Sequence, residues 1–168
     1  MMERADVTDS PDVRALVAVF DELLDGSAAD AAWVLNPHDP GLLASLDRLS
    51  AAQASAVPDS GGASIAAHVD HVRYGLELLN RWSRGDEPFA DADYSASWQR
   101  VAVSEAEWAA RREALRREAS AWRDALQRPR ADSLTERAGV VASVVHLAYH
   151  LGAIRQIDRS IRGPSAQD

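Results

Sequence analysis

Four long stretches of the chain repeat apolar residues at intervals of three and four, the spacing of a helix with one buried face. They lie at about 10–26, 64–85, 104–129 and 133–161. The sequence contains no sustained strand-like alternation of apolar and polar residues. The spacing therefore predicts an all-α protein, in which four helices bury their apolar stripes together as a four-helix bundle.

The segments between these stretches predict how the bundle is connected. Four leucines indicate a short helical insertion after the first helix: Leu42, Leu43, Leu46 and Leu49. Residues 51–62 contain Pro58 and a Gly-Gly pair, and we interpret them as a linker. Residues 89–103 carry aromatic side chains without a sustained period, which is typical of a packed loop.

Length, charge and cysteine content narrow the class of protein. We expect one domain over residues 1–168, with flexible tails at 1–9 and 163–168. The absence of cysteine excludes thiolate ligands, disulfides and cysteine nucleophiles. The formal charge of −8 does not fit a nucleic-acid-binding protein. The N-terminus does not resemble a secretion signal, and no run approaches the roughly 18 apolar residues of a membrane span. These features predict a cytoplasmic protein with no membrane or nucleic-acid partner.

Four of the five histidines lie in pairs on two of the predicted helices. His146 and His150 are four residues apart and differ by about 40° around a helix, so they share one face. His68 and His71 lie on the second long helix, and either could supply a third ring nitrogen. Three protein ligands with a further position left to water are typical of catalytic metal sites. The pattern predicts one divalent metal ion between the two helices; zinc, nickel, copper and iron all accept imidazole ligands.

Several side chains close to these histidines are candidates for the rim of the site. Ser143 shares the histidine face and could either hydrogen-bond a ligand or bound water or ease helix packing. Tyr149, Arg73 and Arg155 could form a polar pocket mouth. Asp70, a carboxylate adjacent to the histidines in sequence, points away from the apolar stripe by helical geometry. No catalytic residue beyond the metal ligands is predicted.

The same residues support a second interpretation without catalysis. A histidine on a buried face can be a hydrogen-bonded core residue, and His38, in a predicted turn, is expected at the surface. The chain would then be a helical-bundle binding module with structural or vestigial histidines. Trp33 and Trp98 could line its pocket or a dimer contact. A closed, dry site would favour this interpretation, whereas an open coordination position would favour an enzyme.

Two segments resemble the DinB-like superfamily: Ser64-Ile65-Ala66-Ala67-His68-Val69-Asp70-His71-Val72 and His146-Leu147-Ala148-Tyr149-His150-Leu151-Gly152-Ala153-Ile154-Arg155-Gln156. The resemblance implies a four-helix bundle with a divalent metal ion, usually zinc or nickel, held by three histidines. By its register the ligands are His71, His146 and His150. His68 takes an apolar position one turn earlier and stays an alternative ligand. Ala67 stands where a glutamate is common, which puts one supporting contact in doubt.

The resemblance also implies a class of reaction. The superfamily includes metal-dependent hydrolases and transferases of low-molecular-weight thiols. Between these two reactions, the resemblance favours the thiol S-transferase for this chain. The substrate is then a small molecule that occupies the open coordination position. The sequence leaves the oligomeric state open, with a homodimer as one candidate assembly.

Overall fold

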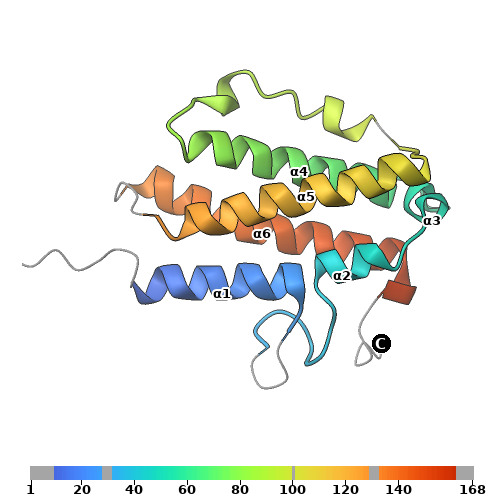
Figure 1. Ribbon diagram of the computed structural model, residues 1–168, viewed down its shortest axis with the longest axis horizontal. Coiled ribbons are helices and arrows are strands. Elements are labelled where there is room, and N and C mark those ends of the chain that lie inside the picture. Colours follow the sequence, from blue (N-terminus) through green and yellow to red (C-terminus); the bar gives the residue numbers. More distant parts are fainter. Residues whose placement is uncertain (1–9, 28–31, 100, 129–132, 162–168) are drawn as a thin grey trace, which may run out of the picture.

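The computed structural model describes residues 10–27, 32–99, 101–128 and 133–161, and the regular structure in these ranges is helical (Figure 1). The long helices are α1 (Pro11–Asp25), α4 (Ile65–Trp82), α5 (Glu105–Leu126) and α6 (Leu134–Ile157). The short helices α2 (Leu42–Asp47) and α3 (Ala51–Ser55) separate α1 from α4. Single 3-10 turns form η2 (Pro88–Ala90), η3 (Ala96–Trp98) and η4 (Arg159–Ile161). The predicted all-α fold with a helical insertion after the first helix is confirmed.

The four long helices pack around a common core in the order α1, α5, α4, α6. Helices α4 and α5 run in the same direction, as two hydrogen bonds between them show. Near the start of both helices Arg111 donates to the carbonyl of Ala66 (3.3 Å), and further along both Asn80 donates to the carbonyl of Glu118 (3.0 Å). The connection between them therefore returns along α4, where η2 and η3 contact that helix (Figure 1). Helix α6 runs antiparallel to α4, so the start of α4 lies beside the second half of α6.

Local sequence explains where these helices begin and end. Ser64 accepts a hydrogen bond from the backbone N–H of Ala67, and Ser104 forms a reciprocal capping box with Glu107. Gly26 ends α1 at a φ of 111°, a conformation that favours glycine. The apolar stripe predicted for the third long helix is buried: Trp108, Leu115, Ala119, Trp122 and Leu126.

The interpretation of residues 51–62 as a linker is wrong at its start, where α3 forms. Ser50 and Gln53 make a capping box, in which the serine hydroxyl accepts from the backbone of Gln53 and the glutamine side chain accepts from that of Ser50. The helix places Ala51 and Ala54 in the core. A five-residue helix is too short to show a helical period in the sequence. The capping residues Ser50 and Gln53 are therefore the sequence feature that could have predicted it.

Helix α6 is apolar on both its inner and outer faces. Its inner face packs against α1 and α4, while the outer face exposes Leu134, Val141, Val145 and Tyr149. In length and composition α6 passes the test for a membrane-spanning helix, with a mean hydropathy of 1.2 over its most apolar window. This differs from the expectation that no segment approaches a span. Packing of the inner face accounts for part of that apolar character within the bundle.

A buried carboxylate attaches the segment after α1 to the bundle. Glu22 accepts hydrogen bonds from the backbone N–H groups of Trp33, Val34 and Leu35 at 2.7–3.2 Å, and it is only 4% exposed. Burial pushes the pKa of Glu22 upward, but the three N–H donors outweigh it and lower the pKa below its ordinary value.

We expect Glu22→Ala to reduce the free energy of unfolding by about 2–3 kcal/mol at pH 7, because it removes the acceptor for these donors. Glu22→Gln, which keeps one oxygen, is expected to cost less. A carboxylate with a lowered pKa stabilises the folded state at neutral pH, and this contribution is lost as the pH falls through the folded-state value. Urea unfolding from pH 7 to pH 3 should therefore show the difference between wild type and Glu22→Gln shrinking in acid. A constant difference would contradict this.

Candidate metal centre

The antiparallel pairing of α4 and α6 brings four histidines together in the bundle. His71, His146 and His150 each offer one ring nitrogen to a common point, and these three atoms lie within 4.8 Å of one another. Nε2 of His146 lies 3.1 Å from Nε2 of His71 and 3.0 Å from Nε2 of His150. Nitrogens around a tetrahedral ion at 2.0–2.1 Å are separated by about 3.3 Å. The three side chains therefore fit the ligand set of a zinc-sized ion.

Ser97 determines which nitrogen of His71 carries the proton. The Ser97 hydroxyl donates to the carbonyl of Tyr94 at 2.7 Å, so its single hydrogen is already used. Its oxygen lies 2.9 Å from Nδ1 of His71 and must therefore accept from that nitrogen. The Nε2 lone pair of His71 is thus left free and faces the convergence point, as a metal ligand requires.

His68 contacts the cluster differently from the other three histidines. Its Nδ1 lies 2.9 Å from Nδ1 of His150, the nitrogen on the far side of that ring from the convergence point. His68 is not a member of the group whose nitrogens could share one ion. Both rings are buried, at 9% and 2% exposure. The structure brings together His71, His146 and His150, the set implied by the family register, and places His68 behind His150.

Aromatic rings form the walls of the cluster. Trp98 stacks on His71 with ring centroids 4.3 Å apart and contacts the edge of His68 at 5.2 Å. Tyr149 contacts His150 edge-on at 5.0 Å but is itself 68% exposed. His146 is only partly buried. The site is therefore enclosed on the α4 side by Trp98 and opens toward the surface near His146 and Tyr149.

Burial keeps all four imidazoles neutral near pH 7. Loss of hydration is the main cause for His150, followed by the rings of His146, His68 and His71, and its pKa falls to about 3. The pKa of His71 falls to about 4 through loss of hydration, with His146 and His68 contributing. Burial also lowers the pKa of His68 and of His146. Neutral imidazole is the metal-binding form, so protons do not compete for these nitrogens at neutral pH.

The other predicted rim residues have different partners. Ser143 accepts a hydrogen bond from the indole N–H of Trp122 at 3.0 Å and donates one to the carbonyl of Val140. It therefore links α5 to α6 and does not hydrogen-bond a metal ligand. Arg155 binds Asp39 and the carbonyl of Pro40. The mouth of the site therefore does not include Arg155.

The acidic side chains of α4 are directed away from the histidines. Arg73 binds Asp70 at 3.1 Å and Glu77 at 2.7 Å, so these three side chains form their own ion-pair group. Among the described residues, no carboxylate lies within hydrogen-bonding distance of the four histidine rings.

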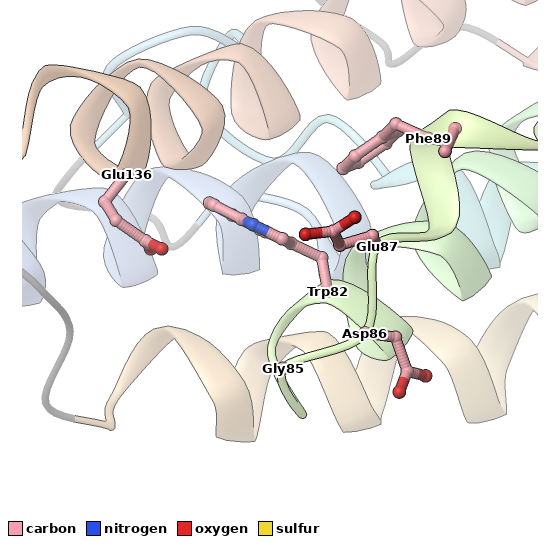
Figure 2. A pocket seen from close by; sticks show the side chains of 7 residues that line it. Trp82, Gly85, Asp86, Glu87, Phe89 and Glu136 are labelled. Atoms are coloured by element: carbon pink, nitrogen blue, oxygen red, sulfur yellow. The ribbon is translucent and has the colours of Figure 1, made fainter.

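A separate pocket of about 490 Å³ lies at the far end of α4 (Figure 2). Its lining is aromatic and acidic: Trp82, Gly85, Asp86, Glu87, Phe89, Ala90 and Glu136. Trp82 follows His71 by eleven residues, a distance of about 16 Å along a helix. This pocket is therefore distinct from the histidine cluster, and its carboxylates disfavour an anionic ligand.

Two residues of the site were hard to recognise from sequence. Ser97 lies in an irregular segment and has no spacing signal that relates it to His71. Trp98 was a candidate for a pocket wall only because it lies outside a periodic stretch. Both reach the histidines because the connection from α4 to α5 returns along α4, a property of the topology that local patterns do not reveal.

The fold and the site together define a class of protein: a helical bundle in which three histidine side chains converge on one point. A family model described as the DinB superfamily matches residues 40–154, which include both histidine segments. The chain belongs to the DinB superfamily. No curated protein and no solved structure shows a significant match to the chain.

Proposed function

We propose that this protein is a metal-dependent enzyme that acts on a small molecule through a divalent ion held by His71, His146 and His150. The observation that carries the proposal is the convergence of their Nε2 atoms, with neighbouring pairs 3.0–3.1 Å apart. Zinc or nickel is the proposed ion, since both accept neutral imidazole ligands. The partial exposure of His146 supports access from the surface and hence an open coordination position.

The charge of the site favours a thiol S-transferase. Three neutral imidazoles leave a divalent ion with its full charge of +2, and no described carboxylate contacts their rings. When bound, such an ion would stabilise the thiolate form of a small thiol, which is the nucleophilic form. The thiolate sulfur then forms a bond to an electrophilic carbon, the leaving group departs with the electron pair of the broken bond, and the thiol proton passes to solvent.

A hydrolase at the same site is the second candidate. Hydrolases that use a metal-activated water usually add a carboxylate as general base. Here Asp70 and Glu77, the carboxylates of α4 nearest the site in sequence, both bind Arg73. The absence of an available base among the described residues makes this candidate the weaker one. A non-enzymatic binding module would require a closed site, which the partly exposed His146 does not favour.

We further infer a cytoplasmic protein that binds neither nucleic acid nor membrane, supported by the net charge of −8. A homodimer stays a prediction. The exposed apolar side chains on the outer face of α6 away from the mouth of the site, Leu134 and Val141, are the surface that supports it.

The cobalt-substituted protein offers a direct test of thiol binding and turnover. Addition of low-molecular-weight bacterial thiols should produce an intense thiolate-to-cobalt absorption band, and an added alkyl electrophile should then be consumed together with the thiol. His71→Ala, which loses a ligand, should show neither effect. Absence of both the band and thiol consumption across the common thiols would contradict the transferase, whereas ester or amide cleavage without them would support the hydrolase.

A further inference from the structure

We propose that His68 is a positioning residue for the metal site: its bare Nδ1 accepts the Nδ1–H of His150 and so holds Nε2 of His150 ready for the ion. The inference rests on the proposed metal site and assigns a role to the histidine that the three-ligand set leaves out. The observation that carries it is the 2.9 Å separation between Nδ1 of His68 and Nδ1 of His150.

Metal binding determines the direction of this hydrogen bond. Nε2 of His150 is the nitrogen that faces His146 and the convergence point, so it must be unprotonated to bind an ion. The neutral ring then carries its proton on Nδ1. With that proton between the two rings, Nδ1 of His68 must act as the acceptor, and His68 carries its own proton on Nε2.

Geometry excludes His68 from direct ligation in this arrangement. Its hydrogen-bonding nitrogen faces the back of the His150 ring, and the ring stands edge-on to Trp98 at 5.2 Å. A direct ligand role would break the contact with His150 and require a rotation away from Trp98. His68 is 9% exposed, so its ring is enclosed by neighbouring groups that would have to move with it.

His68 and Ser97 then perform equivalent tasks for two different ligands. Ser97 accepts from Nδ1 of His71 and thereby leaves its Nε2 free, as His68 does for His150. In other metal sites such a partner can be a carboxylate, which increases the basicity of the imidazole. Neutral partners at both positions leave the charge of a bound ion less compensated. This deepens the proposed function, because a more electrophilic ion binds a thiolate more strongly.

Two substitutions of His68 separate this role from ligation and from simple packing. Asparagine places an amide oxygen near the position of Nδ1 and can accept from His150, whereas leucine fills similar space without an acceptor. We expect His68→Leu to weaken zinc binding by about 10–100-fold, measured by competition with a chromophoric chelator, and His68→Asn to retain most of the affinity. Thermal unfolding of the metal-free variants reports their folding.

Three outcomes would overturn the inference. Equal zinc affinity in wild type and both variants would show that the contact does not position His150. Complete loss of zinc in both variants, with a cobalt spectrum that indicates four nitrogen ligands in wild type, would make His68 a ligand. Nitrogen-15 spectra of the zinc-loaded wild type provide a check that needs no variant: protonation of His150 at Nε2, or of His68 at Nδ1, would contradict the assignment. Wild type that binds no divalent ion would instead remove the proposed function itself.

Discussion

Replacement of His150 by alanine is expected to abolish tight metal binding and raise the Kd for zinc by about a thousandfold or more. Multidentate zinc sites supply about 10–16 kcal/mol through three or four ligands, so each ligand accounts for several kcal/mol. His150 is the most buried member of the set, at 2% exposure, and water cannot readily take its place in the same geometry. Its loss also removes the proposed partner of His68.

Elemental analysis after dialysis measures this effect directly. Wild type, purified without an affinity tag or chelator, should retain about one zinc or nickel ion per chain, and His150→Ala should retain none. His38→Ala is the matched control, because the His38 side chain is exposed in the turn at residues 37–38 and lies outside the cluster. The melting temperature of metal-free wild type should rise on addition of zinc, whereas that of His150→Ala should not. A variant that keeps one tightly bound ion would show that the three-histidine assignment is wrong.

The largest effect on stability is expected from Gly41→Ala. Gly41 lies where the start of α2 meets the end of α1, and a Cβ atom there would lie 2.3 Å from the carbonyl carbon and oxygen of Leu24 and 2.4 Å from the nitrogen of Gly26. These are backbone atoms, so no side-chain rotation relieves the overlap. The conformation of Gly41, with φ of −71° and ψ of −178°, is open to alanine, and the penalty is therefore steric.

We expect Gly41→Ala to reduce the free energy of unfolding by about 3 kcal/mol or more, at the upper end of overpacking effects. Gly152→Ala is the matched control: it lies in α6, is exposed, and its added Cβ meets nothing within 4 Å. That substitution should raise stability by about 0.5–1 kcal/mol through helix propensity. Urea unfolding of both variants at pH 7 measures the contrast. Similar midpoints for Gly41→Ala and wild type would contradict the close approach of α1 and α2.

The long helices and the histidine pairing were predictable because both depend on local periodicity. The cap at Ser64 and the capping box at Ser104 fix where α4 and α5 begin, and the four-residue spacing fixes His146 and His150 on one face. Spacing alone could not choose between His68 and His71: His71 lies at one edge of the apolar stripe and His68 lies closer to its middle, so either could face the neighbouring helix. The choice became geometric once α6 was in place: Nε2 of His71 faces His146, and Nδ1 of His68 faces His150.

Long-range hydrogen bonds were beyond local patterns. Nothing near Glu22 in the sequence predicts that it accepts from a segment eleven to thirteen residues later, since the bonds depend on how the chain folds back after α1. The contact of Ser97 with His71 was equally unpredictable, because a serine in a segment without a helical period can have many structural roles. In both cases the polar group acquires its function from tertiary contacts, and the local sequence carries no period or cap that marks it.

The return of the α4–α5 connection along α4 has a consequence for how such a centre can diversify. The ligands are carried by helices whose inner faces are packed in the bundle, whereas Ser97 and Trp98 are carried by a connection in which the described regular structure consists of single 3-10 turns. Irregular connections accept substitutions and changes of length far more readily than packed helices do. One bundle with an unchanged set of ligands could therefore acquire new substrate preferences by exchange of this connection alone. The same segment is the natural place to begin laboratory redesign of the chemistry.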